Sequence, residues 1–354
     1  MQFTKVNYSD DKIILLLSVA RISFLSAQEK KKLLNNIDSS SSLALMSIED
    51  IENILERSIH KNAIWNGKEN LRCAKISAYR CESSKIQIIS IQDSEYPEIL
   101  RQISDPPFLL FYRGDVSVLT GKSVSVVGTR RITPEGKTAA KTFAYNAVLD
   151  KCNVVSGLAN GVDGYAHQGA LDAFFDSVEK GFDVSALGKT IAVLPSAIDE
   201  IVPYGHKKMA EQIIQSGGCI ISEYEPGMPL KKYHFVGRNR IIAGLSPATV
   251  VIEAPAGSGA LITADFAIDY NRDVMFHQAA FGNMAEQVSQ IVLSDLEKQA
   301  AAGNVSQYKI ENTPEKFLKN GVPIIKDYND YCKVRTEVPG LRSIKYEQGR
   351  LFED

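Results

Sequence analysis

Glycine-rich turns and the arginines near them are the parts of this sequence best suited to chemistry. Glycine lets backbone amides approach an anion closely, and a helix N-terminus adds unpaired N–H groups with a partial positive charge. Arginine contributes planar donors that match phosphate oxygens. The candidate phosphate-binding residues are Gly128, Thr129, Arg130, Ser156, Gly157, Arg238, Asn239, Arg240, Gly257, Ser258 and Gly259. Together they predict a phosphate cradle, and the alternative for any single turn is a plain strand-to-helix connection.

Two pairs of lysines lie near the predicted cradle. Lys207-Lys208 and Lys231-Lys232 either contact a nucleic-acid backbone or belong to the solvated surface. Three tyrosines near them in sequence have rings that can either stack on bases or pack, namely Tyr204, Tyr224 and Tyr233. We include Lys207 and Lys208 among the candidate DNA- and phosphate-binding residues.

The standard nucleotide and nucleophile motifs are absent from the sequence. It contains no Gly-x-x-x-x-Gly-Lys-Ser/Thr loop, no Gly-x-Gly-x-x-Gly after the first strand of the alternating part, and no nucleophile elbow. His167 follows Asp163 by one helical turn. This pair suits either acid–base chemistry or an orienting hydrogen bond that fixes the helix start, and we favour the second role.

Cysteine content, charge and hydropathy limit the cofactor, partner and compartment. Five scattered cysteines without a C-x-x-C pair, and histidines without metal-ligand spacing, predict free thiols in a reducing compartment, no metal and no cofactor. With 40 basic and 42 acidic residues the net charge is -2, so a nucleic-acid partner requires a local basic patch. No apolar run approaches the ~18 residues of a membrane span, and no secretion signal is present. We expect a soluble, cytoplasmic protein that does not contact a membrane.

Hydrophobic periodicity predicts the elements that position these residues. Apolar residues recur at three and four positions between 9 and 81, which indicates short helices, one of them capped by Ser47 and Asp50. An extended stretch at 86–91 and an apolar run ending near Gly114 read as strands. The further expected strands are 124–127, 153–156, 190–194, 219–222 and 249–253, and the expected helices are 134–149, 163–171, 205–216 and 259–271.

Strands that alternate with helices predict an α/β fold with a doubly wound, mostly parallel sheet. In such a sheet the ligand crevice lies beyond the carboxyl ends of the strands, where the glycine turns fall. We expect a small helical domain at 1–85, similar to SAM or helix-hairpin-helix modules. A doubly wound α/β domain at 86–332 follows, with an insertion at 172–188. Within 317–330 we expect a helix that ends at a glycine and then a strand, and 333–354 should be a polar tail without a winged helix.

A series of motifs in fixed order resembles the DNA-processing protein A (DprA, or Smf) family. The series runs through Tyr96-Pro-Glu-Ile-Leu, Asp105-Pro-Pro, Tyr112-Arg-Gly-Asp115, Val126-Val-Gly-Thr-Arg130, Ser156-Gly-Leu-Ala-Asn-Gly-Val-Asp163, Thr190-Ile-Ala-Val-Leu194, Ile221-Ser-Glu-Tyr224, Arg238-Asn-Arg-Ile-Ile-Ala-Gly-Leu245, Val251-Ile-Glu-Ala254 and Ser258-Gly-Ala-Leu-Ile-Thr-Ala264. The matching region covers about half of the chain, from Tyr96 to Phe276.

The resemblance implies an extended Rossmann-like domain that binds single-stranded DNA without sequence preference. It also implies a non-enzymatic protein that loads a RecA-type recombinase during natural transformation (competence) or recombination, usually as a homodimer. Carried over by motif, the DNA-contacting positions are Arg130, Arg238, Asn239 and Arg240. A lysine that the family has just after a Tyr-Pro is not matched, and Lys207 or Lys208 takes its place.

Two other functions stay open from the sequence. The related lysine-decarboxylase-like (LOG) group binds nucleotides or hydrolyses nucleoside monophosphates, but Thr263 stands where that group has its glutamate. A threonine cannot supply the carboxylate that this chemistry needs. The second alternative keeps the fold and changes the pathway, as in a specialised relative with another partner that acts against foreign DNA.

Overall fold

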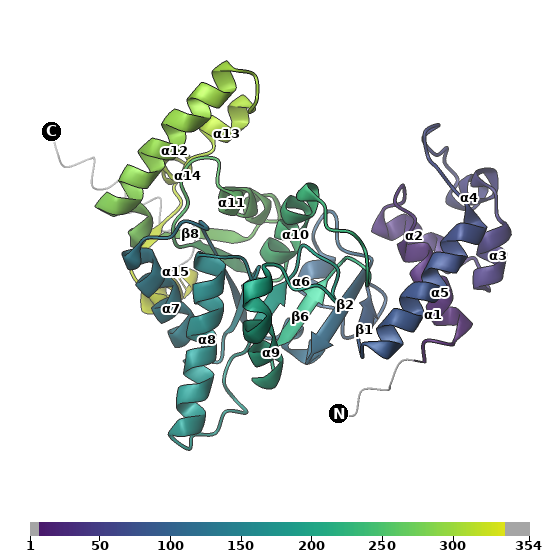
Figure 1. Cartoon of the computed structure of the whole chain (residues 1–354), viewed down its shortest axis with the longest axis horizontal. Coiled ribbons are helices and arrows are strands. Elements are labelled where there is room, and N and C mark those ends of the chain that lie inside the picture. The colour runs from purple at the N-terminus through teal and green to yellow at the C-terminus, as the bar shows by residue number, and fades with distance from the viewer. Residues whose placement is uncertain (1–6, 337–354) are drawn as a thin grey trace.

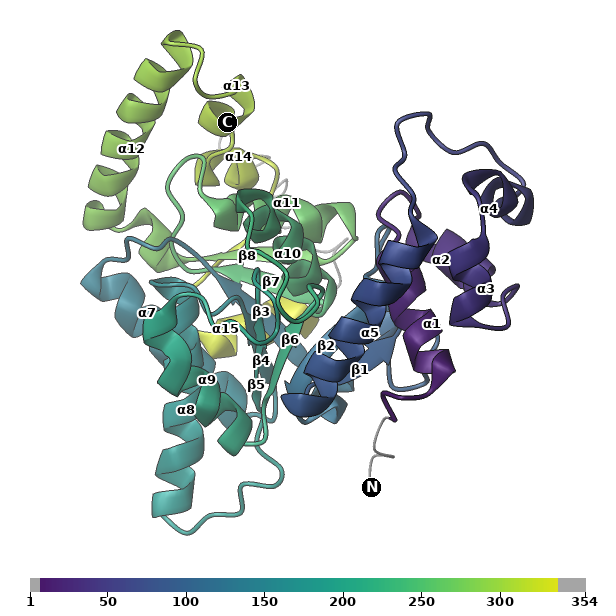
Figure 2. The same cartoon turned by 45° about the vertical axis from the view of Figure 1, so that its right-hand side comes forward.

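The computed structural model describes residues 7–336, which form a group of helices beside a larger layered part. Figure 1 shows the N-terminal helices, in purple and blue, on one side of the central sheet, and Figure 2 shows the same arrangement after a 45° turn. Within residues 7–336, no helix is long and apolar enough to cross a membrane.

The N-terminal part consists of short helices that bury their apolar faces against each other. Their bounds are α1 Asp11–Ala20, α2 Ala27–Leu34, α3 Ser40–Leu45, α4 Ile48–Leu55 and α5 Gly67–Ser83. Leu17, Leu33 and Ile51 lie at the centre of this core and are at most 1% exposed. Ser47 caps α4, and Asp50 returns the hydrogen bond, which confirms the predicted capping box.

The larger part is built on a nine-stranded sheet with the order β1-β2-β6-β5-β4-β3-β7-β8-β9. The strands are β1 Gln87–Ser90, β2 Leu109–Gly114, β3 Ser123–Val127, β4 Asn153–Ser156, β5 Thr190–Val193, β6 Cys219–Ser222, β7 Ala248–Val251, β8 Asp273–His277 and β9 Ile324–Ile325. β1 pairs antiparallel with β2, and β2 pairs antiparallel with β6, while the remaining pairs are parallel. The predicted α/β class with a mostly parallel sheet is confirmed.

Alternating residues of β3 show how helices cover both faces of the sheet. Val124 and Val126 are buried in one apolar cluster with α7 (Pro134–Leu149) and α8 (Val162–Glu179). On the other face, the hydroxyls of Ser123 and Ser125 donate to the carbonyls of Leu245 and Ile242 at the end of α10 (Lys232–Gly244). These bonds satisfy carbonyls that a helix end leaves without partners.

Further helices and 3₁₀ turns connect the strands of the sheet part. Helix α9 (Lys207–Gln215) follows a 3₁₀ turn η2 (Tyr204–His206), and α11 (Gly259–Asp269) packs beside α10. The other elements are α6 Glu98–Arg101, η1 Val116–Thr120, η3 Gln278–Phe281, α13 Gln307–Glu311, α14 Pro314–Lys319 and α15 Tyr328–Thr336. Helix α14 followed by β9 confirms the helix and strand expected within 317–330.

Two local expectations were wrong, and one helix was not expected. Helix α8 does not stop at Leu171 but continues to Glu179, because Ala173 and Ser177 stay buried on its inner face, so the segment 172–188 begins as helix. Residues 333–336 belong to α15 and are not a tail, and the rest of the expected tail lies outside the described residues. The long α12 (Asn283–Ala301) was not among the expected elements. It has no fully buried residue, although Val288, Val292 and Leu296 recur at helical spacing on a half-buried face.

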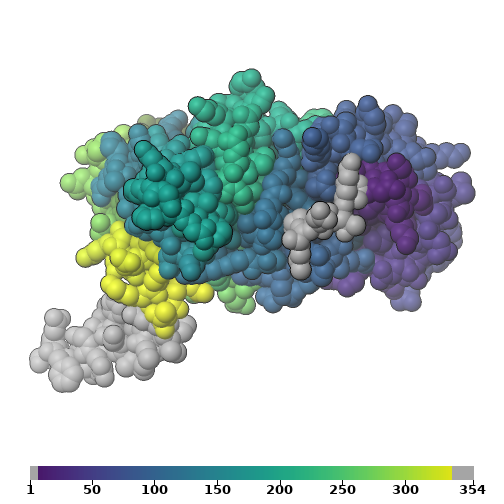
Figure 3. Space-filling view, turned by 90° about the horizontal axis from the view of Figure 1, so that it is seen from below, coloured from purple at the N-terminus to yellow at the C-terminus, as the bar shows by residue number. Residues whose placement is uncertain are grey.

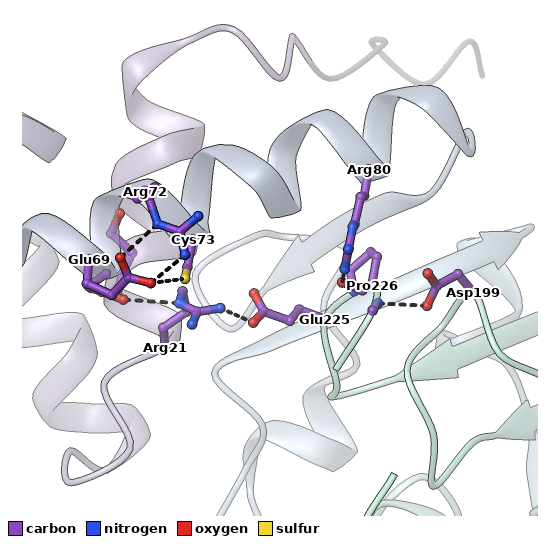
Figure 4. A network of polar contacts seen from close by, with 11 residues as sticks. Arg21, Glu69, Arg72, Cys73, Arg80, Asp199, Glu225 and Pro226 are labelled. Carbon is purple, nitrogen blue, oxygen red and sulfur yellow. Dashed lines mark hydrogen bonds and ion pairs between the residues drawn. The ribbon is translucent and has the colours of Figure 1, made fainter. Parts of the chain in front are cut away.

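The two parts meet along the connection between β6 and α10. Arg21, directly after α1, forms an ion pair with Glu225, and Arg80 of α5 donates to the carbonyl of Pro226 at 2.9 Å (Figure 4). Figure 3 shows that the last described residues, in yellow, lie at the opposite end of the molecule from the N-terminal helices. The connection between β6 and α10 is one of several contacts between the two parts. The Lys30 ammonium also lies 5.8 Å from the Phe108 ring centroid, and the Gln92 side chain donates to Asn35 at 3.2 Å.

Candidate functional site

An open cleft of about 930 Å³ lies at the carboxyl ends of β3 and β7. The chain leaves β3 toward β4 on one side while β7 lies on the other, so this is the switch point where open α/β sheets bind ligands. The cleft brings together most of the candidate residues, namely Gly128, Thr129, Arg130, Arg238, Asn239, Gly257, Ser258 and Gly259. Ser156, Gly157, Lys207, Lys208 and Arg240 do not line it.

The turn after β3 presents two cations to the cleft. The Thr129 amide donates to the carbonyl of Glu253 at 2.6 Å, and its hydroxyl accepts from the Arg131 amide at 3.1 Å. These bonds fix the backbone that carries Arg130 and Arg131, whose side chains are exposed. Among residues 7–336, neither arginine is ion-paired with a carboxylate, and Arg130 stacks over the Phe235 ring at 5.1 Å. Both guanidinium groups are thus available for an anion.

The turn before α11 forms the facing wall. Gly257 has a φ of +65°, which favours glycine, and its amide donates to the Asn312 carbonyl at 3.0 Å. The Ser258 hydroxyl caps the helix by accepting from the Ala260 amide at 3.3 Å. Asn239 links the two neighbouring helices by donating to the Gly259 carbonyl at 3.1 Å. Ser258 and Asn239 therefore shape the wall through internal bonds.

Arg238 forms the floor of the cleft. Its side chain is 5% exposed, and its Nη1 donates to the Val193 carbonyl at 3.1 Å and lies 3.8 Å from Asp163 Oδ2. A Cβ at Gly157 would lie 1.2 Å from the same nitrogen, so the guanidinium occupies the space that this glycine leaves. Nε has no hydrogen-bond partner among the described residues. Burial lowers the pKa of Arg238, and the Asp163 carboxylate opposes that change.

Asp163 and His167 orient the turn after β4, but they do not bond to each other. Asp163 accepts from the Gly157 amide at 3.2 Å, and burial raises its pKa against the opposing effect of Arg238. His167 accepts from the Leu158 amide at 3.3 Å and contacts the Thr190 hydroxyl at 2.7 Å. Burial, followed by the charges of His206 and Arg238, lowers the pKa of His167 to about 3. A histidine that stays neutral and bonded on both nitrogens is a positioning residue.

Arg240 lies away from the cleft. Its Nε is 2.9 Å from Asp105, and its Nη2 is 2.7 Å from Glu223. Arg238 and Arg240 are two positions apart on α10, and residues at that spacing do not face the same side of a helix. The expectation that both arginines line one crevice is therefore wrong, since Arg240 is held by two internal carboxylates.

The other residues predicted to bind DNA or phosphate are either buried or lie outside the cleft. Ser156 is fully buried and donates to the Val126 carbonyl at 2.7 Å. Lys207 and Lys208 are exposed at the start of α9, outside the cleft. Of the three tyrosines, Tyr224 stacks on His234 with 3.8 Å between ring centroids, so its ring already has a partner on that face.

Sequence reasoning missed one wall of the cleft. Helix α12 contributes Ile291, Ser294, Asp295 and Lys298 to it. Its sequence signal was the recurrence of Val288, Val292 and Leu296 at four-residue spacing within a run of good helix formers. Phe235, which stacks with Arg130, lies three residues before Arg238 and was not among the predicted binding residues. Within residues 7–336 no cluster of three metal-ligating side chains occurs.

A doubly wound sheet with a glycine- and arginine-lined cleft at its switch point defines a Rossmann-like protein. The model of the family "DNA recombination-mediator protein A" matches residues 87–310. The chain belongs to this family, which confirms the resemblance to DprA and Smf proteins.

Individual relatives agree with the family match. Protein Smf of Borreliella burgdorferi is 30% identical over 266 residues, which cover 75% of this chain and 79% of that protein. DNA processing protein DprA of Streptococcus pneumoniae is 38% identical over 193 residues, 54% of this chain and 63% of that protein. The X-ray structure of the Streptococcus pneumoniae DprA superposes with a TM-score of 0.61 at 25% identity, covering 93% of this chain and 98% of that chain.

Proposed function

We propose that this protein binds single-stranded DNA in the cleft, without sequence preference, and mediates loading of a RecA-type recombinase on that strand. The observation that carries the proposal is the pair of exposed guanidinium groups of Arg130 and Arg131 over a glycine-lined cleft, neither of which has a carboxylate partner within residues 7–336. Phosphate contacts of this kind are independent of sequence. The names of the relatives support a role in DNA processing.

The test measures binding of labelled single-stranded and duplex oligonucleotides by fluorescence anisotropy over a range of salt concentrations. Replacing both Arg130 and Arg131 by glutamine should weaken single-strand binding, and each lost phosphate contact should reduce the salt slope by roughly 0.7. Arg113→Gln is the matched control, because Arg113 is exposed and pairs in register with Ile220 near the start of β6, at the opposite edge of the parallel strands. Unchanged affinity in the double variant would remove the cleft as the DNA site.

Recombinase loading and a homodimer belong to the same proposal. Loading is tested by adding the protein to RecA and single-stranded DNA coated with a single-strand-binding protein, and following filament growth. Light scattering of the purified chain tests the dimer. A protein that binds DNA but leaves filament growth unchanged would refute loading while leaving DNA binding intact.

Hydrolysis of a nucleotide has less support than DNA binding. Thr263, at the position of the glutamate in the related hydrolases, is 1% exposed, and its hydroxyl donates to the Gly259 carbonyl at 3.3 Å. The Asp163 carboxylate in the floor faces Arg238 and the Gly157 amide. We propose a non-enzymatic role, and release of ribose phosphate from nucleoside monophosphates above background would overturn it.

A further inference from the structure

Helix α12 adds a wall to the cleft that carries its own charge. The helix lies at the end of the molecule away from the N-terminal helices (Figure 2). A Cβ at Gly257 would lie 3.0 Å from Leu296 Cδ1, so α12 packs against the turn before α11. Ile291, Ser294 and Asp295 line the cleft from this side. The volume of about 930 Å³ lies within the range of about 300–1,000 Å³ that is usual for small-molecule sites.

The cleft contains groups of both charges that have no ion-pair partner. Arg130 and Arg131 are exposed on the turn after β3, without a carboxylate partner within residues 7–336. On α12, the exposed Asp295 accepts from the Gln299 side chain at 2.6 Å, and no cation pairs with it in the described part of the chain. A carboxylate accepts hydrogen bonds from hydroxyl or amino groups and repels a phosphate. The cleft therefore suits a ligand with an anion at one end and hydrogen-bond donors at the other.

Apolar side chains also line the cleft and remain in contact with water. Val236 on α10 is 43% exposed, and Ile291 on α12 is 71% exposed. Phe235 precedes Val236, and its ring centroid lies 5.1 Å from the Arg130 guanidinium. A planar ring bound in the cleft would remove apolar surface of these side chains from water, which favours binding. An anion, a planar ring and hydroxyl donors are the three parts of a nucleotide.

We propose that the cleft also binds a free ribonucleoside monophosphate. Arg130 and Arg131 hold the phosphate, the base packs against Val236 and Ile291, and the ribose hydroxyls donate to Asp295. In a continuous DNA strand the 3′-oxygen is esterified and the 2′-hydroxyl is absent, so the strand offers Asp295 no sugar hydroxyl. The α12 wall therefore fits the free ribonucleotide better than it fits the strand.

A ribonucleotide in the cleft would regulate the binding of DNA. Both ligands need the guanidinium groups of Arg130 and Arg131, so they should compete for them. This consequence rests on the proposed function of the cleft, whereas binding of the ribonucleotide itself does not.

Isothermal titration calorimetry of the full chain with AMP, GMP, CMP and UMP tests the site. At least one of the four should bind. Its 2′-deoxy form should bind about tenfold more weakly, because a hydrogen bond to a charged acceptor is lost. The matching nucleoside and inorganic phosphate should both bind more weakly than the complete ribonucleotide. Absence of binding by all four, or equal affinity for the ribose and deoxyribose forms, would overturn the proposal.

Asp295→Ala tests the α12 wall, with Glu297→Ala as the matched control. Both carboxylates are exposed on α12, and Glu297 does not line the cleft. Asp295→Ala should weaken ribonucleotide binding at least about tenfold. The same variant should bind single-stranded DNA at least as tightly as the wild type, since a negative charge leaves the cleft. Unchanged ribonucleotide affinity, or an equal loss of affinity for DNA, would overturn the role of Asp295.

Competition separates this inference from the proposed function. Adding the ribonucleotide to the complex with a labelled single strand should lower the anisotropy, and Asp295→Ala should require about tenfold more ribonucleotide for the same effect. A wild-type protein that binds DNA but no ribonucleotide would overturn the nucleotide site and leave the proposed function standing. A protein that binds the ribonucleotide but no DNA would overturn the proposed function and support the nucleotide site.

Discussion

Exchanging Arg238 for glutamine should destabilise the protein far more than the same change at Arg130. Arg238 is 5% exposed at its side chain, donates to a strand carbonyl and faces the buried Asp163, whereas Arg130 is exposed. Removing one partner of a buried ion pair costs about 3–5 kcal/mol, while an exposed substitution stays within about 0.5 kcal/mol. Asp163 keeps the Gly157 amide as a donor, which places the expected loss near the lower bound, about 3 kcal/mol.

Urea unfolding followed by circular dichroism measures the difference in stability between the two variants. Fluorescence anisotropy measures their difference in DNA affinity. Arg238→Gln should lower the urea midpoint, and Arg130→Gln should leave the midpoint unchanged but weaken DNA binding. Adding Asp163→Asn to Arg238→Gln should recover part of the lost stability, because the uncompensated buried charge is removed.

The opposite pattern would refute this assignment. If Arg238→Gln unfolded like the wild type and lost DNA affinity as Arg130→Gln does, Arg238 would be a DNA contact and not the structural floor of the cleft. Equal destabilisation by both changes would also contradict the reasoning, since it rests on their different burial.

Three further predictions concern neighbouring positions. Arg240→Glu should lower the melting temperature strongly, because it places a third carboxylate beside the two that the arginine now neutralises; a melting temperature near the wild-type value would contradict this. Gly157→Ala should cost about 1–3 kcal/mol in urea unfolding, since its methyl group would occupy the space of the Arg238 guanidinium. Burial lowers the pKa of Lys30 to about 8, against 10.5 for the unfolded chain. Between these pH values the unfolded chain binds more protons than the folded protein, so the free energy of unfolding should rise from about pH 8 to 10.5. Lys30→Met should lack this rise, which urea unfolding of both proteins over that pH range would show.

The strands and the glycine turns could be predicted from the sequence because burial on both faces leaves continuous β-branched runs. The predicted bounds 134–149, 153–156 and 219–222 match α7, β4 and β6 residue for residue. The turns at 128–130 and 257–259 also meet in one cleft as expected, since parallel strands bring their carboxyl ends to one edge.

The roles of the arginines could not be read in the same way. Arg238 and Arg240 occupy buried helix positions, and their partners Asp163, Asp105 and Glu223 are remote in sequence. The sequence around an arginine in a glycine-rich segment does not distinguish an arginine that binds a ligand from one that pairs with a carboxylate of the same chain. Helix α12 was missed although Val288, Val292 and Leu296 recur at helical spacing, and none of its residues is fully buried.

The connection between β6 and α10 also couples the unfolding of the helical part to that of the sheet. Glu223 holds Arg240 in the sheet part, Glu225 holds Arg21, and the Pro226 carbonyl accepts from Arg80. Loss of the N-terminal helices would leave the segment without two of these partners, and loss of the sheet would leave the helices without theirs. We therefore expect both parts to unfold in a single cooperative transition, with calorimetric and van't Hoff enthalpies that agree.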